Sequence, residues 1–380
     1  MQPFTFTYGP RVLATSTGAT ELPALLPDGP VLLVTDDQLV ALGLAGPWIA
    51  ELEKKRPVIM FSAVEADPSK ATLLAAVEAG RAAGVTSVVG FGGGSPMDVA
   101  KLAAYLLGSG DDLDSIWGVE VAVGRKLPLV LVPTTAGTGS EATPISVITV
   151  DGGTKLAVNA RAITADVAIL DPTLTVGLPR HVTAATGIDA MVHAVEAYTS
   201  ARLKNPLSDA LAREALRLLS ANLIRACNVP DDLAARSAML LGAHLAGVAF
   251  ANAPVAGVHA LAYPLGGLHH LPHGLSNALM LRHVLQHNAE AARDHYAELA
   301  EIVAPDCAGQ GSQAKCAILI DTLDRMITDS GLKPRLRDHG IATSDIPLLA
   351  REAMKQQRLL VNNPCSIDEA DAARLYEAAW

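Results

Sequence analysis

Short apolar runs and helix-length patterns alternate through the first half of the chain. The segments 31–35 (VLLVT), 58–62 (VIMFS), 85–91 (VTSVVGF) and 127–132 (LPLVLV) are each typical of a buried strand. A helix is predicted over 96–107, directly after the third of these runs. Because strands that alternate with helices form parallel sheets covered by those helices, the first half is predicted to be an α/β domain.

One further helix is predicted after the second strand. Asp67 is expected to cap its free N–H groups, and Pro68 suits a first helical turn. Leu73 and Val77 give this helix an apolar face, and Gly84 can end it.

The second half of the chain has a different pattern. After Leu178-Pro179, long stretches rich in alanine and leucine dominate, and few runs resemble strands. Examples are 182–200, 208–226 and 234–251. We therefore predict an α/β domain over residues 1–179 and an all-α domain over residues 180–380.

Composition and charge limit the classes of protein. Of 380 residues, 50% are hydrophobic and 18% are charged, which is typical of a globular protein with a sizeable core. The formal net charge is −10 and no cluster of lysine and arginine is present, so nucleic acid is not an expected partner. No run approaches the roughly 18 consecutive apolar residues of a membrane span, so no membrane partner is expected either.

Cysteine usage and the first residues bear on location. Cys227, Cys307, Cys316 and Cys365 form no CxxC pair and no zinc-type spacing, which favours free thiols in a reducing compartment. The first ten residues, MQPFTFTYGP, lack the basic and apolar regions of a signal peptide. We therefore expect a cytoplasmic protein.

A glycine turn lies between the third strand and the helix that follows it. Glycines at 92–94 let the backbone approach a ligand closely, and Ser95 begins a helix whose N-terminus favours a phosphate. The run is neither GxGxxG nor a Walker loop, so a plain tight turn is the alternative. Asp98 and Lys101, on the same helix, are interpreted as a first-turn partner of the helix dipole and a surface charge.

Two other features follow strands of this domain. The segment 133–141 (PTTAGTGSE) offers hydroxyls and glycines directly after a buried strand, which suits either a ligand-binding loop or a capping loop. Asp36 ends the first strand, where a carboxylate can accept hydrogen bonds from a ribose diol and would repel a 2′-phosphate. A helix N-cap is the alternative role for Asp36.

A candidate metal site lies in the helical half. Asp189 and His193 are four residues apart, so a helix presents both on one face. Pro264 and the glycines after it predict that a helix carrying His259 ends near Tyr263, and His273 is expected to begin the next helix. Three imidazoles and one carboxylate suit Fe²⁺ or Zn²⁺. The nearby His269, His270 and His283 are interpreted as surface residues or as neighbours of the ligands.

Four segments resemble the iron-containing (group III) alcohol dehydrogenases along nearly the whole chain. They are GGGSPMDVAK (92–101), PTTAGTGSEAT (133–143), GIDAMVHAVEAY (187–198) and GVHALAYPLGG…LPHGLSNAL (257–279). The resemblance implies an N-terminal Rossmann-like domain, a helical C-terminal domain and an active site in a cleft between them. It also implies NAD as cofactor, a small alcohol or aldehyde as substrate, and assembly as a homodimer or larger homo-oligomer.

The same resemblance implies roles for individual residues. Asp189, His193, His259 and His273 would be the ligands of Fe²⁺, with Zn²⁺ as the other candidate. Gly93, Gly94 and Ser95 would hold the pyrophosphate, and Asp36 would meet the adenosine ribose. Thr134, Thr135 and Thr138 would line the adenine or nicotinamide side, and Lys155 and Leu178 would lie near the nicotinamide ribose. Many members have a further histidine at the position of Tyr263; here the tyrosine, a bulk-connected water or the ribose hydroxyls would relay the proton.

The function predicted on these grounds is metal-dependent, NAD(H)-linked interconversion of an alcohol and its aldehyde or ketone. One alternative is a reductase of a carboxylated substrate, of the 4-hydroxybutyrate or maleylacetate type, with Arg161, Arg180 or Lys204 pairing the carboxylate. A second is a non-catalytic nucleotide-binding protein with a structural metal. The absence of cysteine near the predicted ligands argues against the second, because structural zinc sites are usually cysteine-rich.

Overall fold

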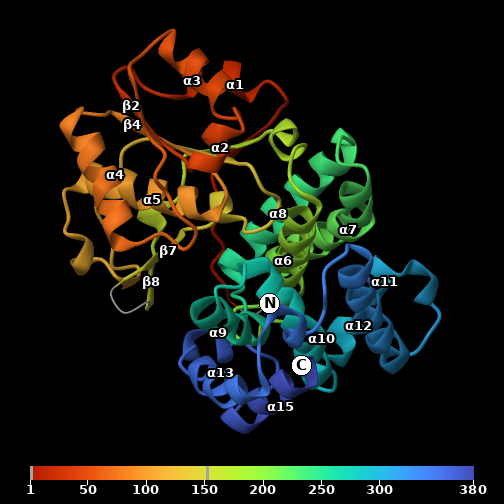
Figure 1. Ribbon diagram of the computed structural model, residues 1–380. Helices are drawn as coiled ribbons and strands as arrows, with labels where there is room; N and C mark the ends of the chain where they lie inside the picture. Colours follow the sequence, from red (N-terminus) through yellow and green to blue (C-terminus); the bar gives the residue numbers. More distant parts are fainter. Residues whose placement is uncertain (1–2, 151–153) are drawn as a thin grey trace. The chain divides into compact units, whose positions relative to one another are not determined.

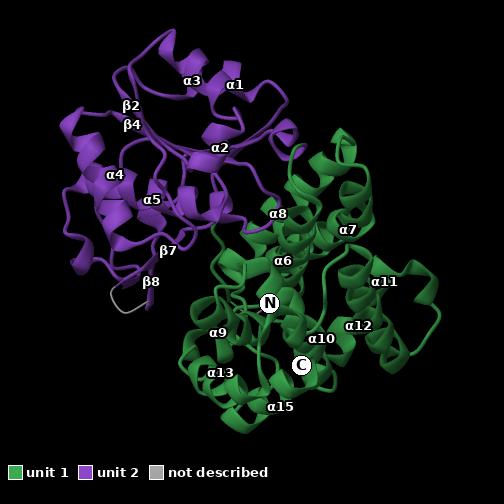
Figure 2. Cartoon of the chain, in the orientation of Figure 1, with its two compact units in different colours: residues 1–7, 177–380 green, residues 8–176 purple. Residues whose placement is uncertain are grey.

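The computed structural model describes residues 3–150 and 154–380 and contains two compact units (Figures 1 and 2). The α/β unit comprises residues 8–176, and the helical unit comprises residues 1–7 together with residues 177–380. Each unit has the class of structure predicted for its part of the chain, so the predicted fold class is confirmed. Residues 1–7, assigned above to the α/β domain, group with the helical unit.

The α/β unit is built on a parallel sheet of six strands in the order β1-β9-β6-β4-β2-β3. Its strands are β1 (Arg11–Ala14), β2 (Val31–Val34), β3 (Val58–Phe61), β4 (Ser87–Gly92), β6 (Leu129–Pro133) and β9 (Val167–Leu170). A smaller sheet joins β5 (Gly118–Val119), β8 (Lys155–Asn159) and β7 (Ile145–Thr149) in that order. The four predicted strands correspond to β2, β3, β4 and β6.

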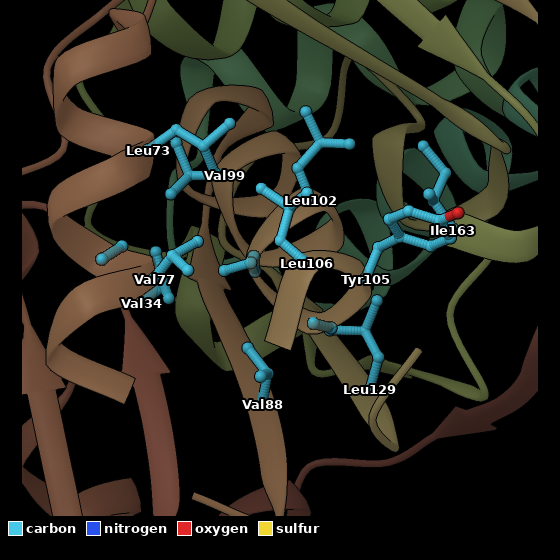
Figure 3. Close-up of a cluster of buried hydrophobic side chains, with 14 of the residues drawn as sticks. Val34, Leu73, Val77, Val88, Val99, Leu102, Tyr105, Leu106, Leu129 and Ile163 are labelled. Carbon is cyan, nitrogen blue, oxygen red and sulfur yellow. The ribbon is translucent and has the colours of Figure 1, made fainter. Parts of the chain in front are cut away.

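Helices cover both faces of the larger sheet. They are α1 (Gly18–Glu21), α2 (Asp37–Ala41), α3 (Gly46–Glu53), α4 (Lys70–Ala82) and α5 (Gly94–Ser109). On one face, Leu73 of α4 and Leu102 of α5 pack in a cluster with Val34 and Val88 of the strands (Figure 3). On the other face, Trp48 of α3 packs against Phe91, with ring centroids 5.4 Å apart. Because both faces are buried, the central strands are apolar throughout instead of alternating.

The order of the large sheet changes direction beside β2. The chain passes from β2 to β3 on one side and then returns to β4 on the other side. Such a switch point leaves a crevice at the carboxyl ends of the two strands, where ligands bind in open α/β sheets. Asp36 follows β2 and the glycine turn follows β4, so both flank this switch point.

The helix predicted to begin at Asp67-Pro68 begins slightly later. Ser69 is the residue that caps α4, and its Oγ accepts a hydrogen bond from the Thr72 N–H at 3.1 Å. Asp67 instead has a positive φ of 54° and pairs with Lys155, Nζ to Oδ1 2.7 Å. The chain therefore turns at Asp67 before the helix starts, and the prediction that this residue is the cap was wrong.

The helical unit packs α6, α7 and α8 against one another, with shorter helices around them. Its helices are α6 (Arg180–Thr199), α7 (Pro206–Asn228), α8 (Leu233–Asn252), α9 (Gly257–His269), α10 (His273–Asn288), α11 (Arg293–Val303), α12 (Ser312–Asp329), α13 (Ile346–Ala353), α14 (Gln357–Leu360) and α15 (Glu369–Ala379). Thr7 joins this unit through its N–H, which donates to Asn252 Oδ1 at 2.7 Å. Among the described residues, only α8 is long and apolar enough to cross a membrane, and 61% of its apolar window is buried within the protein.

Helix α9 runs further than predicted. Sequence analysis ended it near Tyr263, but it continues through Pro264 to His269. It stops where His270 adopts a positive φ of 56° and its N–H donates to Gly266 O at 3.0 Å. Pro264 removes one backbone donor, and the packing of α9 against α10 and α13 offsets that loss.

Candidate functional site

Helix α6 carries two of the predicted metal ligands at the centre of the helical unit. Asp189 and His193 lie one turn apart, and their exposed fractions are only 1% and 4%. Burying a carboxylate and an imidazole side by side costs free energy unless they pair or hold a cation. Their nearest atoms, Asp189 Oδ1 and His193 Nε2, are 3.9 Å apart.

Helices α9 and α10 bring the other two predicted ligands to the same place. His259 lies in the first turn of α9, and His273 is the first residue of α10, as predicted. Their Nε2 atoms lie 3.9 and 3.7 Å from Asp189 Oδ1. One donor atom from each of Asp189, His193, His259 and His273 lies within 4.8 Å of the other three.

This group of four residues, called the His₃Asp cluster below, fits a divalent ion. Donors that share one Fe²⁺ or Zn²⁺ at about 2.0–2.2 Å lie roughly 3–4 Å from one another, close to the separations found here. Three imidazole nitrogens and one carboxylate oxygen are the donors that such ions accept. The cluster therefore has the composition and the spacing to hold one metal ion.

Asn277, one turn after His273, is a member of the site that sequence analysis missed. Its Nδ2 donates to Asp189 Oδ1 at 2.6 Å and lies 3.2 and 3.3 Å from the Nε2 atoms of His259 and His273. The donor atoms of three of the four proposed ligands thus lie around the amide nitrogen of Asn277. Asn277 occurs within the quoted segment 257–279, but nothing in its spacing marks it as part of the cluster.

The charge state of Asp189 suits a cation. Burial by itself raises the pKa of this carboxyl group, but His193, His273 and His259 and the hydrogen bond from Asn277 act in the opposite direction. Their combined effect holds the pKa of Asp189 below its ordinary value. The group is therefore a carboxylate and not a carboxylic acid at neutral pH.

One side of the His₃Asp cluster is open and bordered by aromatic rings. His273 has 37% of its side chain exposed, whereas the other three ligand side chains are buried. The Phe250 ring stacks on His193 at a centroid distance of 4.4 Å, and the Tyr263 ring lies 5.8 Å from His273. Both rings are partly exposed, so an apolar rim borders the cluster. Sequence analysis singled out Tyr263 but missed Phe250.

The glycine turn of the α/β unit has the geometry expected of a phosphate cradle. Gly93 is the N-cap of α5, and Gly94 and Ser95 form its first turn. A β-carbon on Gly93 would meet nothing closer than Thr135 Oγ1 at 3.6 Å, whereas one on Gly94 would come within 3.1 Å of Thr138 Cγ2. The hydroxyl-rich loop after β6 therefore lies directly over the start of α5.

A buried ion pair fastens this loop. Lys101 has no exposed surface; its Nζ lies 3.2 Å from Asp98 Oδ1 and donates to Ile145 O. Asp98 in turn accepts hydrogen bonds from Ser140 Oγ at 2.6 Å and the Val147 N–H at 2.9 Å. The prediction of a surface charge at position 101 was wrong, because α5 turns this side chain toward β7 and not toward solvent.

The other predicted cofactor residues occupy varied positions. Thr134 is buried and its N–H donates to Gly92 O at 3.0 Å. Asp36 caps α2, with Oδ1 accepting from the Leu39 N–H at 2.9 Å, which is the alternative role considered above. Lys155 pairs with Asp67 on the smaller sheet, and Leu178 belongs to the helical unit. Within the α/β unit, the structure thus groups the glycine turn with the loop after β6.

The three basic residues considered for a substrate carboxylate all have structural partners. Arg180 donates to the backbone carbonyls of Ser330 and Asp329, each at 3.0 Å. Lys204 donates to Asp209 Oδ1 at 2.6 Å, and exposed Arg161 lies 3.7 Å from Glu120. Each of the three side chains thus has a partner of its own, and none of these contacts involves the His₃Asp cluster.

Comparison with known proteins gives matches to both units. The family model for iron-containing alcohol dehydrogenase matches residues 10–172, and the model for the C-terminal part of the Fe-containing alcohol dehydrogenase family matches residues 183–380. Long-chain-alcohol dehydrogenase 1 of Geobacillus thermodenitrificans is 41% identical over 354 residues, which cover 92% of this chain and 89% of that protein.

Solved structures agree with these matches. The structure of 1,3-propanediol oxidoreductase has a TM-score of 0.96 and 33% identity to this chain, and the match covers 100% of both chains. Sulfoacetaldehyde reductase from Bifidobacterium kashiwanohense, solved in complex with NAD⁺, has a TM-score of 0.88 and 27% identity, with 100% of this chain and 99% of that chain covered.

A parallel α/β unit with a glycine turn at its switch point, followed by a helical unit with a His₃Asp cluster, defines a metal-dependent type of oxidoreductase. With both family models matched, the chain belongs to the iron-containing alcohol dehydrogenase family. It is an enzyme that interconverts an alcohol and its aldehyde or ketone. The predictions of family, fold class and enzyme class are confirmed.

Proposed function

We propose that this enzyme uses one divalent metal ion and NAD to oxidise neutral alcohols and to reduce the matching aldehydes or ketones. Asp189, His193, His259 and His273 are the proposed ligands of the ion. The convergence of these four donors, from three helices, is the observation that carries the proposal. Fe²⁺ is the proposed native ion on the strength of the family, and Zn²⁺ would suit the same donors.

When bound, a divalent ion held by the His₃Asp cluster would supply Lewis-acid chemistry, and NAD would supply the hydride chemistry. The side chains of the protein would bind the substrate and orient it. Phe250 and Tyr263 border the open side of the His₃Asp cluster, so the hydrocarbon part of a substrate would pack on their rings. Tyr263 is the proposed proton relay, since this partly exposed residue has its ring 5.8 Å from that of His273.

The proposed NAD site lies at the switch point of the α/β unit. Backbone N–H groups of Gly93, Gly94 and Ser95 would receive the pyrophosphate, because they begin a helix and the space beside Gly93 is open. Thr134, Thr135 and Thr138 would contact the base or the nicotinamide. Asp36 would contact the adenosine ribose through the oxygen that does not cap α2, and would disfavour NADP. Lys155 and Leu178 are proposed neighbours of the nicotinamide ribose. The relative solved with NAD⁺ supports the choice of cofactor.

A neutral substrate is favoured over a carboxylated one. The rim of the cluster is aromatic, and Arg180, Lys204 and Arg161 are held by other groups. The names of two relatives, a long-chain-alcohol dehydrogenase and a 1,3-propanediol oxidoreductase, agree with a neutral alcohol. We further propose that the enzyme acts in the cytoplasm as a homodimer or larger homo-oligomer; light scattering of the purified protein measures the second point.

The test is anaerobic purification with metal analysis, followed by NAD⁺ and NADH assays on neutral alcohols, their aldehydes and ω-carboxylated aldehydes. We expect about one metal ion per chain and turnover with neutral substrates that is lost with a chelator and restored by Fe²⁺. Turnover with carboxylated aldehydes alone would refute the substrate class. Full turnover without any metal would refute the role of the His₃Asp cluster.

A further inference from the structure

A second buried carboxylate, Glu196, lies behind the His₃Asp cluster. It belongs to α6, seven residues after Asp189 and three after His193, and only 3% of it is exposed. Glu196 is not among the clustered donors. Its oxygens point to the start of α9, where they meet the Nδ1 side of the His259 ring.

Glu196 accepts three hydrogen bonds, all from the beginning of α9. Oε2 accepts from the Ala256 N–H at 2.9 Å and lies 2.6 Å from His259 Nδ1, while Oε1 accepts from the Val258 N–H at 2.6 Å. Ala256 is the N-cap of α9 and has no side-chain oxygen to satisfy those N–H groups. Glu196 of α6 therefore caps α9 and contacts His259, the proposed ligand on that helix.

These contacts determine which nitrogen of His259 carries the ring proton. A carboxylate accepts hydrogen bonds and does not donate them, so Nδ1 must be the protonated nitrogen. Nε2 then keeps its lone pair, which points toward Asp189 and the amide of Asn277 on the opposite side of the ring. Only that tautomer can offer Nε2 to a metal ion.

We propose that Glu196 is a positioning residue for the metal site: it holds His259 in the Nδ1-protonated tautomer and fixes the ring by capping α9. The inference rests on the proposed function, because it requires His259 to be a ligand. Glu196 and two of the proposed ligands are on α6, so this one helix both supplies donors and orients a donor of another helix.

Glu196→Gln tests the proposal because it keeps the size of the side chain but replaces one of its two acceptor oxygens by an NH₂ group. If the new amide NH₂ faces His259, Nδ1 must accept, and the ring proton moves to Nε2, where it blocks the metal. If the amide turns over, its NH₂ opposes a backbone N–H at the start of α9. Outer contacts of this kind typically change metal affinity about 10–100-fold, and we expect a loss in that range.

The matched control is Asn363→Ala. Asn363 Oδ1 accepts from the Gly257 N–H at 3.2 Å, so it caps the same end of α9, but no described contact joins it to His259. Apparent affinity for Co²⁺ is measured on the full-length apoprotein by the cobalt absorption bands, in competition with a chelator. We expect Asn363→Ala to bind Co²⁺ within about threefold of wild type, because it leaves the His259–Glu196 pair intact.

The outcomes separate the two proposals. If wild-type protein does not bind Co²⁺, the proposed function fails. If wild type binds and Glu196→Gln binds equally well, or Asn363→Ala loses as much affinity, the positioning role is refuted. Turnover at saturating Co²⁺ should recover to within a few-fold in Glu196→Gln, whereas a residue that takes part in the reaction would leave it depressed.

A measurement on the wild type alone covers the case in which Glu196→Gln does not fold. In metal-free protein labelled with ¹⁵N-histidine, long-range proton–nitrogen spectra identify the protonated nitrogen of each ring. The His259 signal, assigned by its loss in His259→Asn protein, should show the proton on Nδ1. A proton on Nε2 would overturn the proposal.

Discussion

The two units build their candidate sites from different materials. In the α/β unit the proposed phosphate contacts are backbone N–H groups at the start of α5. The side chains of Asp98 and Lys101 form an ion pair beneath the loop after β6 and hold that loop in place. In the helical unit the donors are side chains from α6, α9 and α10. The proposed phosphate site depends on glycines that lack side chains, whereas the His₃Asp cluster depends on the identity of its side chains. Substitutions should therefore separate cofactor binding from metal binding.

The largest effect is expected for Asp189→Ala. All three imidazole Nε2 atoms lie within 3.9 Å of Asp189 Oδ1, and this carboxylate is the one negatively charged donor of the cluster, so its loss should abolish tight metal binding. Since a metal ion contributes several kcal/mol to such a transition state, kcat/KM should fall by at least about a thousandfold. NADH binding, followed by fluorescence, should be unchanged.

His270→Asn is the control for that comparison, because His270 is exposed and outside the cluster. It should keep both metal and turnover. If Asp189→Ala also weakened NADH binding about tenfold or more, the two sites would not be separable in the way that the comparison requires.

Lys101→Met should be the most destabilising change in the α/β unit. The substitution leaves Asp98 mostly buried without its cation, and removing one member of a buried pair costs about 3–5 kcal/mol. Urea unfolding measures this loss. Lys54→Met removes an exposed pair with Glu51 and should cost less than about 1 kcal/mol; equal losses from the two substitutions would contradict the buried role of Lys101.

Gly93→Ala should weaken the cofactor without harming the fold. The new β-carbon would meet only Thr135 at ordinary contact distance, and the backbone at Gly93 is extended, which alanine adopts freely. It would, however, stand where the proposed pyrophosphate approaches. Losing one charge-assisted hydrogen bond costs about 1.5–3 kcal/mol, so KM for NAD⁺ should rise roughly ten- to a hundredfold.

Metal content and melting temperature are the accompanying measurements, and Gly46→Ala, where a β-carbon meets nothing within 4 Å, is the control. An unchanged KM for NAD⁺ in Gly93→Ala would show that the cofactor is not bound at this turn.

The smallest effect is a difference in how the two units respond to alkaline pH. In the helical unit, burial and the hydrogen bond to Glu298 raise the pKa of Tyr198 from 10.0 to about 12, although Arg213 opposes the shift. The folded state therefore holds this proton more tightly than the unfolded chain. The stabilisation is complete below pH 10 and is lost as pH rises toward 12.

The contribution of Lys101 to stability changes with pH in the opposite direction. Burial lowers its pKa below 10.5, against the attraction of Asp98 and Glu141, so the unfolded chain binds this proton more tightly. Stability from Lys101 should increase as pH rises toward 10.5. Urea unfolding of wild type, Tyr198→Phe and Lys101→Met between pH 8 and 12 measures both slopes; slopes of the same sign for the two side chains would refute this difference.

The local sequence was enough to predict those parts of the molecule in which neighbouring residues in the chain also form the structural feature. The runs at β2, β4 and β6 were recognisable because both faces of the sheet are buried there, which makes each of these strands apolar throughout. Strand β3 lies at the edge of the sheet and is only partly buried, but its residues are apolar as well, so the same pattern identified it. Strand β1 was not recognised, because it is a short strand at the edge of the sheet with mostly exposed residues. Asp189 and His193 could be paired from their spacing alone, since one helical turn separates them.

Contacts between distant segments could not be read in this way. Lys101 appears as an ordinary charged residue of α5 until β7 is placed beside it. Glu196 lies within a segment that sequence analysis quoted, one helical turn after His193, so its position carried a signal; its partners at the start of α9 carried none. Pro264 predicted the end of a helix that tertiary packing extends to His269.

The arrangement of the His₃Asp cluster has a consequence for how long the protein survives in a cell. Its donors come from three helices whose ligands are far apart in the chain, so an ion held there is a reversible cross-link across the helical unit. An ion that binds the folded chain and not the unfolded one adds about 1.4 kcal/mol of stability for each tenfold rise of its free concentration above Kd. Supply of metal would then govern turnover of the protein by proteases as well as turnover of substrate, and the pool of enzyme would shrink whenever the ion became scarce.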